Sequence, residues 1–234
     1  MAIVYSPDLR YALLGKTGSG KTLFALVLVG LLVPMESEGW ECWWADTKDY
    51  PPDLAQLHAW GFREHGTKAA ELTPRKLWSL RGSDAEVVAQ AQDLARRALE
   101  RTAVLLVFDE WSHVVVSTQR AGPGVERAQK SGRGKIGLLG GVQEPVLTPR
   151  VLFSQASVLA LFNLTHRGDI EIAQKLCPFY APNWPKDDTD PLPDPHGFWL
   201  KSLDQHGKDG RWAYWPSVQE WRASVQEWRA PIKT

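Results

Sequence analysis

The stretch Gly15-Lys16-Thr17-Gly18-Ser19-Gly20-Lys21-Thr22 matches the phosphate-binding pattern G-x-x-x-x-G-K-[ST] at every fixed position. An apolar run, residues 11–14, precedes it, and a helical run, residues 23–27, follows it. This context predicts a strand, a loop whose glycines turn N–H groups onto phosphate oxygens, and a helix with its positive dipole end at the phosphates. We expect Lys21 to reach the β- and γ-phosphates of ATP and Thr22 to bind Mg2+. The chain is therefore predicted to be a nucleoside triphosphatase.

Composition sets limits on size and partners. A chain of 234 residues is long enough for one α/β domain with a small appendage. Lys and Arg total 27 and so do Asp and Glu, so any contact with DNA must come from a local patch. Cys42 and Cys177 lack metal-like spacing and fit the core of a protein from a reducing compartment. The longest apolar stretch, residues 23–33, is shorter than the roughly 20 residues of a membrane span. We expect a cytoplasmic protein that does not span a membrane.

Apolar runs alternate with helical patterns as far as residue 176. The expected strands after the first are 41–45, 76–80, 104–108, 136–142 and 158–163, and the expected helices after the first are 54–61, 84–101 and 169–176. The run 104–108 is uniformly apolar, as in a central parallel strand covered on both faces. The alternation predicts an α/β fold with a mainly parallel central sheet, helices on both faces, and ligands at the carboxyl ends of the strands.

Beyond Cys177 the chain becomes rich in proline. Six prolines between residues 178 and 195 predict an extended segment. Residues 198–203 and 211–215 predict a C-terminal β-hairpin with a long loop. We therefore divide the chain into a P-loop ATPase core, residues 1–177, and an extension, residues 178–234, packed on the core or on a neighbouring subunit.

The heptad SVQEWRA occurs twice in tandem, at residues 217–223 and 224–230. Seven-residue spacing puts four apolar side chains on one face of a short helix: Val218, Trp221, Val225 and Trp228. Two heptads are too few for a stable coiled coil alone. Two interpretations remain open, a tail helix docked on its own domain and a clip onto a neighbouring subunit or another partner.

The acid pair Asp109-Glu110 ends the apolar run 104–108. In triphosphatases, an aspartate at such a strand end holds magnesium, and a neighbouring glutamate polarises the attacking water. We assign these roles to Asp109 and Glu110 in that order. At least one strand, around Trp43, intervenes between the P-loop and the pair. This spacing and the adjacent acids predict a RecA-like, additional-strand P-loop NTPase rather than a GTPase or a small kinase. No guanine-reading N-K-x-D motif is present.

Two further features are candidates for the site. Gln143 follows the strand 136–142 and is placed to touch the γ-phosphate or orient water. Residues 118–135 hold five cations against one acid, Glu126: Arg120, Arg127, Lys130, Arg133 and Lys135. We interpret this segment as a flexible basic loop at the active-site edge that contacts DNA or a neighbour's nucleotide, with an ordinary solvated loop as the alternative. Arg133 and Arg167 are the candidates for an arginine finger.

Five motifs in this order resemble the FtsK–HerA superfamily of DNA-pumping ATPases. They are GKTGSGKT at 15–22, DTK at 46–48, LLVFDE at 105–110, SGRGKIG at 131–137 and VQEP at 142–145. Members of that family typically show D-x-K, a hydrophobic run before D-E, G-R-x-x-G-I, and T-Q-x-P. The resemblance covers roughly residues 10 to 176. It departs from the family where Val142 replaces the usual Thr and where Gly134-Lys135-Ile136 shortens the G-R segment.

Within the superfamily the chain resembles the compact genome-packaging ATPases of tailless, membrane-containing double-stranded DNA viruses. That resemblance implies an ATP-driven translocase that threads double-stranded DNA into a preformed capsid as a homo-oligomeric ring of five or six subunits. It also implies a place in the host cytoplasm or at a packaging vertex, with capsid vertex or internal membrane proteins as partners. The alternatives are a plasmid- or conjugation-type DNA pump, a filamentous phage assembly ATPase and, from other classes, a small-molecule kinase or a nucleotide-gated scaffold.

Overall fold

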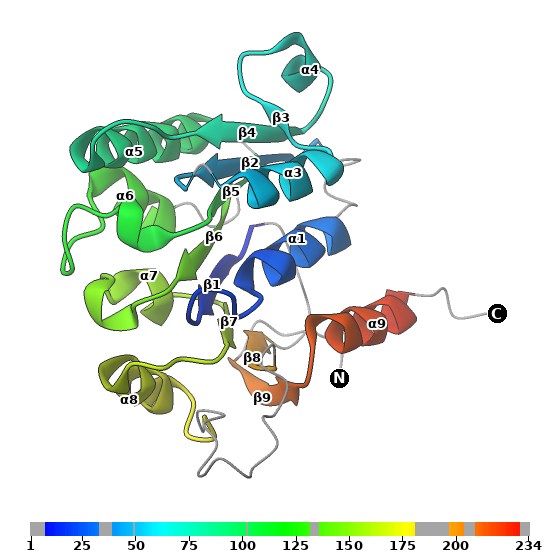
Figure 1. Cartoon of the computed structure of the whole chain (residues 1–234), viewed down its shortest axis with the longest axis vertical. Coiled ribbons are helices and arrows are strands. Elements are labelled where there is room, and N and C mark those ends of the chain that lie inside the picture. The colour runs from blue at the N-terminus through cyan, green and yellow to red at the C-terminus, as the bar shows by residue number, and fades with distance from the viewer. Residues whose placement is uncertain are drawn as a thin grey trace.

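One mixed sheet organises the chain (Figure 1). The computed structural model describes residues 8–32, 39–48, 50–101, 103–131, 136–180, 197–203 and 209–229. Within these ranges nine strands form one sheet in the order β3-β4-β2-β5-β6-β1-β7-β8-β9. Their bounds are β1 (Arg10–Leu14), β2 (Glu41–Asp46), β3 (Arg63–Glu64), β4 (Arg75–Ser79), β5 (Val104–Phe108), β6 (Ile136–Val142), β7 (Val158–Leu161), β8 (Phe198–Leu203) and β9 (Asp209–Trp215). Strands β1 to β7 pair in parallel, and β8 and β9 extend the sheet in antiparallel fashion beside β7.

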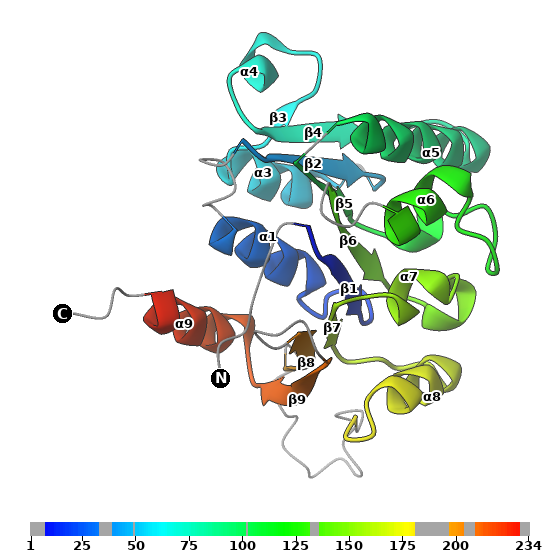
Figure 2. The same cartoon turned by 180° about the vertical axis from the view of Figure 1, so that it is seen from behind.

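Helices cover both faces of the sheet (Figure 2). On one face lie α1 (Lys21–Leu31), α3 (Pro51–Ala59) and α9 (Val218–Arg229), and on the other α5 (Asp84–Glu100), α6 (Pro123–Ser131), α7 (Val151–Ser154) and α8 (Arg167–Leu176). The short α4 (Lys68–Glu71) and the 3-10 turns η1 (Trp111–His113) and η2 (Pro145–Leu147) complete the elements. The predicted mainly parallel sheet with helices on both faces is confirmed.

Strand β5 shows why the central strands are uniformly apolar. Leu105 and Val107 point into the core on the α1 side, and Leu106 and Phe108 point into the core on the α5 side. Alternate side chains of a strand face opposite sides of a sheet. A strand covered on both faces therefore needs apolar residues at every position. In the described part of the chain no helix has the length and hydropathy to cross a bilayer.

The order of strands corrects one expectation. The strand around Trp43 is β2, which follows the P-loop in sequence but lies beyond β5 in the sheet. The strand between β1 and β5 is β6, which pairs in parallel with both. Two of its glycines, Gly140 and Gly141, let this inserted strand lie close to Trp111 and Asp109. The additional strand is therefore β6, which Gln143 follows.

The prediction of a flexible loop over residues 118–135 is wrong for residues 123–131, which form α6. The side chain of Gln92 on α5 accepts hydrogen bonds from the N–H groups of Gly124 and Val125, at 2.9 and 3.1 Å. The buried guanidinium of Arg10 donates to the carbonyls of Ala128 and Gln129 at the other end. Both ends of α6 are thus capped by side chains from distant parts of the sequence. Arg133 and Lys135 lie outside the described residues.

The prolines at 51 and 52 open α3, three residues before the expected start of this helix at 54, at a position where a missing N–H costs nothing. The hairpin predicted near the C-terminus is present as β8 and β9. Most of the segment of six prolines, from residue 181, lies outside the described residues.

The first copy of the tandem heptad docks on the chain's own domain. Val218 and Trp221 of α9 are buried. The indole of Trp221 stacks on Phe24 of α1, with ring centroids 4.3 Å apart and planes at 22°. Phe198 of β8 meets Phe24 edge-on at 5.1 Å. In the second copy, Val225 packs partly buried against the same core, and the side chain of Trp228 lies outside the described residues.

Replacing the buried indole should loosen α9 from α1. Trp221→Ala removes a fully buried ring, and such truncations lower the free energy of unfolding by about 3–5 kcal/mol. Urea denaturation followed by circular dichroism measures the change. The control is Arg222→Ala on the exposed face of the same helix, which should stay close to wild type. A loss of under about 1 kcal/mol for Trp221→Ala would show that α9 is not docked in solution.

Candidate functional site

The phosphate-binding loop lies between the carboxyl ends of β6 and β7. Its first two residues are held by backbone hydrogen bonds, Gly15 N–H to Val142 O and Lys16 N–H to Asn163 O, both 2.9 Å. Gly18 and Gly20 have φ of 75° and 96°, in the left-handed region that favours glycine. This backbone leaves the N-terminus of α1 without a side-chain cap. The free N–H groups and the helix dipole form a site for phosphate.

Lys21 is buried at the base of this loop. Its ammonium donates to the carbonyls of Gly15, at 2.5 Å, and Lys16, at 2.9 Å. Burial lowers the pKa of Lys21 from 10.5 to about 8, the charge of Glu110 works against that shift, and Lys48 adds to it. The side chain is therefore still mainly protonated at pH 7, and it is held as a cation where phosphate oxygens would replace its carbonyl partners.

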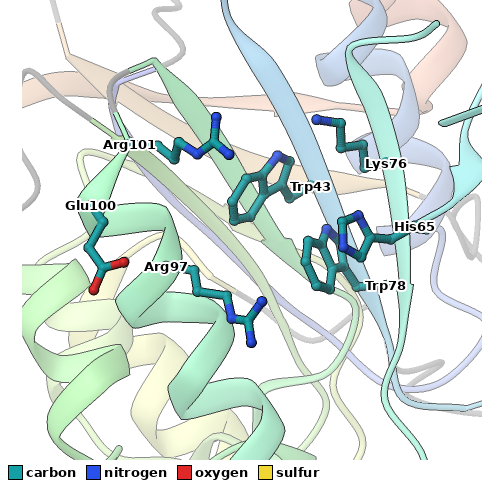
Figure 3. Close-up of a pocket in the computed structure, with 7 residues that line it drawn as sticks. All are labelled: Trp43, His65, Lys76, Trp78, Arg97, Glu100 and Arg101. Carbon is teal, nitrogen blue, oxygen red and sulfur yellow. The ribbon is translucent and has the colours of Figure 1, made fainter. Parts of the chain in front are cut away.

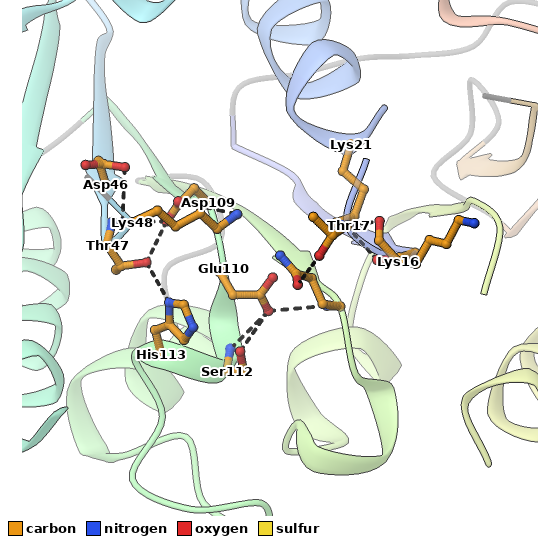
Figure 4. A network of polar contacts seen from close by, with 12 residues as sticks. Lys16, Thr17, Lys21, Asp46, Thr47, Lys48, Asp109, Glu110, Ser112 and His113 are labelled. Atoms are coloured by element: carbon orange, nitrogen blue, oxygen red, sulfur yellow. Dashed lines mark hydrogen bonds and ion pairs between the residues drawn. The ribbon is translucent and has the colours of Figure 1, made fainter. Parts of the chain in front are cut away.

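Asp109 directly follows β5 and is buried beside the loop (Figure 4). One carboxylate oxygen accepts hydrogen bonds from the N–H and the hydroxyl of Thr47, at 3.3 and 3.1 Å. The other lies 3.7 Å from the ammonium of Lys48. Burial raises the pKa of Asp109 to about 6; Lys48 and Thr47 oppose this shift, and Asp46 and Glu110 add to it. The carboxylate is therefore mainly ionised at pH 7, and burying this charge lowers the free energy of unfolding.

Glu110 is 1% exposed, and its two carboxylate oxygens differ in their hydrogen bonding. Oε1 accepts from the N–H of Ser112 at 3.3 Å, its hydroxyl at 3.0 Å, and the N–H of Gln143 at 3.2 Å. Oε2 is buried and has no hydrogen-bond partner. A buried acceptor without a partner is costly. The three donors thus fix the carboxylate so that one oxygen is left for a group that enters the site.

Gln143 connects this acid to the loop. Its backbone bonds Glu110, and its side-chain oxygen accepts from the hydroxyl of Thr17 at 2.7 Å. The close approach of β6 to Asp109 and Trp111 depends on the two glycines before Gln143. A Cβ at Gly141 would lie 2.4 Å from the carbonyl oxygen of Asp109, and one at Gly140 would lie 1.9 Å from the ring of Trp111. Residues with side chains would push β6 away from the acids.

The residues Asp46-Thr47-Lys48 form the far wall of the site. Asp46 is buried and pairs with Arg81, with a guanidinium nitrogen 2.5 Å from its carboxylate. Thr47 lies between Asp109 and His113, whose Nδ1 is 3.0 Å from the threonine hydroxyl. Sequence reasoning did not find Arg81, Ser112 or His113. His113 and Ser112 follow the acid pair by a few residues, which is the one signal the sequence offers.

A cleft of about 800 Å³ opens over these groups. Its lining comes from the loop, from the second strand's end and from α9: Thr17, Gly18, Gly20, Lys21, Thr22, Leu23, Lys48, Tyr50, Asp53, His113, Gln143, Val218 and Gln219. The volume lies within the range of about 300–1,000 Å³ typical of ligand sites. The C-terminal extension therefore contributes a wall of the candidate nucleotide site, which no motif predicted.

Those predicted cations that the structure describes lie outside this cleft. Arg120 and Arg127 are exposed, and Lys130 pairs with Glu126 on α6 at 3.2 Å. Helix α6 ends just before the amino end of β6, so Lys130 lies toward the opposite end of the sheet from the loop. Arg167, at the start of α8, has a side chain that is 93% exposed and pairs with Glu171 at 3.1 Å.

Similar folds occur among solved structures. The crystal structure of B204, the DNA-packaging ATPase from Sulfolobus turreted icosahedral virus, matches with a TM-score of 0.62 and 16% identity, over 90% of this chain and 98% of that one. The genome-packaging NTPase B204 from Sulfolobus turreted icosahedral virus 2 matches in complex with sulfate, with a TM-score of 0.59 and 15% identity over 89% and 96%. The chain has the fold of a RecA-like P-loop ATPase. In complex with ATP-gammaS, the second protein matches with a TM-score of 0.57 and 13% identity, over 92% of this chain and 100% of that one. No family model and no curated protein sequence matches the chain.

The residues of this P-loop ATPase fold suit ATP and Mg2+. Lys21 and the N-terminus of α1 offer donors to a triphosphate, and Thr22 and Asp109 offer a hydroxyl and a carboxylate to the metal. The described residues hold no group of three His, Cys, Asp or Glu side chains that would bind a metal alone. Magnesium is usually bound through one or two carboxylates together with substrate phosphates, so this sparse set fits it.

Removing the charge of Asp109 should stabilise the protein. Its folded pKa lies above the ordinary 3.8, so the wild type loses stability as pH rises from about 4 to 6. Asp109→Asn has no charge at this position and does not lose stability over this pH range. Its free energy of unfolding should exceed that of the wild type by about 2–3 kcal/mol at pH 7 and equal it near pH 4. Urea denaturation across this pH range measures the difference. As a control, Asp46→Asn removes the partner of Arg81 and should destabilise. Equal stability of Asp109→Asn and wild type at pH 7 would contradict the assignment.

Proposed function

We propose that this protein is an ATP-hydrolysing translocase that packages double-stranded viral DNA into a preformed capsid. The hydrolytic part rests on the geometry around Glu110, and the DNA part rests on the motifs and on the similarity of the fold to a DNA-packaging ATPase. The proposal places Lys21, Glu110 and Gln143 in catalysis, residues 15–22 on the phosphates, and Thr22 and Asp109 on Mg2+.

The observation that carries the hydrolytic role is the free oxygen of Glu110. Three donors on Oε1 hold the carboxylate in one orientation, and Oε2 is buried with no partner. A general base needs a lone pair that no other donor occupies, at a fixed position beside the proton that it takes. A base of this kind can also serve a kinase, in which the acceptor brings its own hydroxyl. We take water as the nucleophile because the fold is similar to that of NTPases and ATPases.

Each residue has a separate task in this mechanism. Lys21 neutralises charge on the β- and γ-phosphates, and the N–H groups at the start of α1 hold them in place. Mg2+, when bound at Thr22 and Asp109, would neutralise the phosphates and orient them. Glu110 accepts the proton from the attacking water through Oε2. Gln143 is hydrogen-bonded to both Glu110 and Thr17. Loss of the γ-phosphate on hydrolysis would therefore change the contacts of β6 and of the phosphate-binding loop together.

Coupling to DNA requires more than one subunit in this proposal. We place the chain in a homo-oligomeric ring of five or six subunits, in the host cytoplasm or at a packaging vertex with capsid vertex or internal membrane proteins. The exposed side chain of Arg167 is not engaged in its own cleft, as a finger that acts on a neighbour's nucleotide would be. Arg133 keeps the same candidate role. Arg120, Arg127, Lys130 and Lys135 remain the proposed DNA contacts, of which Arg127 and Lys130 lie on α6.

Glu110→Gln tests the reaction and its coupling together. Removal of a general base should lower kcat for ATP about 100- to 10,000-fold, while nucleotide binding stays near wild type. ATP hydrolysis is measured by phosphate release, with and without long double-stranded DNA, and ATP binding by calorimetry. The matched control is Glu144→Gln, an exposed glutamate in the same loop, which should keep full activity.

Three results would contradict the proposal in different ways. Hydrolysis that persists in Glu110→Gln would remove Glu110 as the base. Turnover that ignores DNA and requires a small acceptor would favour a kinase. ATP binding without turnover in the wild type, with or without DNA, would favour a nucleotide-gated scaffold.

A further inference from the structure

A second pocket, of about 210 Å³, lies on the α5 face of β2 and β4, beside the last turn of α5 (Figure 3). We call it the aromatic–cationic pocket, and its lining consists of Trp43, His65, Lys76, Trp78, Arg97, Glu100 and Arg101. It shares no lining residue with the nucleotide cleft. The ATPase mechanism uses none of these side chains.

Three aromatic rings form one wall of the pocket. Trp43 on β2 and Trp78 on β4 have ring centroids 5.3 Å apart, and His65 stacks on Trp78 at 3.6 Å with planes at 16°. Trp43 and Trp78 point to the same side because they lie two register positions apart on neighbouring parallel strands. This wall is broad and apolar, and it lies beside the charged end of α5. It fits a flat ring better than an aliphatic chain.

The charges around the pocket leave one cation unpaired. Three ion pairs join Lys76 to Glu41 at 2.7 Å, Arg97 to Asp93 at 2.6 Å, and Arg96 to Glu100 at 3.3 Å. Within the described ranges Arg101 forms no ion pair, although its charge helps to lower the pKa of Glu41. Burial, together with Lys76 and Arg97, lowers the pKa of His65, so this ring is neutral at pH 7. When the charges of these ion pairs are cancelled, one positive charge remains at the pocket. Exposed Arg101 carries it.

The pocket also has a donor without an acceptor. The indole N–H of Trp78 is buried and makes no hydrogen bond. The N–H of Trp43, in contrast, donates to Glu41 at 2.5 Å. An unpaired buried donor is costly unless a ligand supplies an acceptor. The occupant should thus combine a flat ring, at least one acceptor atom and one negative charge.

We propose that the aromatic–cationic pocket binds one nucleotide of a single nucleic-acid strand. The base packs against the wall of Trp43, Trp78 and His65, and the phosphodiester, which carries one negative charge, pairs with Arg101. Bases inside a duplex already stack on one another and present no free face. The volume is below the roughly 300 Å³ of sites for larger ligands, which suits one nucleotide of a strand that continues into solvent. The chain therefore has a site for unpaired nucleic acid apart from its proposed duplex contacts.

Binding of a fluorescent oligothymidylate, followed by anisotropy without ATP, tests this site. Trp78→Ala should weaken the complex about 5- to 150-fold, as loss of one stacked base does, and Trp78→Phe should restore most of the affinity. Arg101→Gln should weaken binding and reduce the slope of log K against log salt by about 0.7, the value for one phosphate contact on a single strand. Arg222→Gln, on the exposed face of α9 and on the opposite side of the sheet from the pocket, is the matched control and should leave both quantities unchanged.

The outcomes separate this proposal from the translocase. Lys21→Ala, which disables the nucleotide cleft, should bind oligothymidylate as the wild type does. Because Arg101 is exposed, Arg101→Gln tests the pocket even if Trp78→Ala fails to fold. Oligothymidylate binding that is absent, or unchanged in Arg101→Gln and Trp78→Ala, overturns the proposal and leaves an aromatic peptide with a carboxylate as the ligand of matching chemistry. Stimulation of ATP hydrolysis by duplex DNA is measured separately and can succeed or fail on its own.

Discussion

The structure depends on holding two adjacent carboxylates, Asp109 and Glu110, in the interior at the end of a central strand. Burial raises the pKa of Asp109, and the buried ammonium of Lys21 and the nearby Lys48 supply the opposing charge. A Cβ at Gly141 would clash with the carbonyl of Asp109 and contact the Lys21 side chain, so the glycines at 140 and 141 let β6 lie close against the acids. The phosphate loop, the additional strand and the acids are therefore one electrostatic unit, and its free acceptor on Glu110 is left for a substrate.

Around this unit the aromatic core connects the C-terminal extension to the phosphate loop. Phe24, two residues after Thr22, packs against Phe162, Phe198 and Trp221, which come from three separate parts of the chain. Phe162 also closes the space beside Gly15. Because α9 both stacks on α1 and lines the cleft, movement of the loop on nucleotide binding would reach the C-terminal helix directly. The tail is thus structurally part of the nucleotide site.

Much of this arrangement could be predicted from local signals. The P-loop octapeptide needs glycines and a lysine at fixed spacing, and the run before Asp109 needs apolar residues at every position because the strand is covered on both faces. The candidate residues Lys21, Asp109, Glu110 and Gln143 do lie together. Arg81, Ser112 and His113 could not be found, since polar residues after strands are common and only their contacts give them a role. The position of the additional strand was also misplaced, because sequence order does not determine neighbours in a sheet.

By itself, the sequence determined the ligand class and the alternation of strands and helices, since both follow from residue types at short spacing. The tertiary structure alone decided which segments come together. Residues 123–131 carry three charges between Gly122 and Gly132 and read as a loop. They are nevertheless helical, because Gln92 caps one end and Arg10 the other, from positions about 30 and 120 residues away. The aromatic–cationic pocket likewise combines two strands, a loop and a helix end. Such contacts depend on packing between distant segments, and no local pattern encodes them.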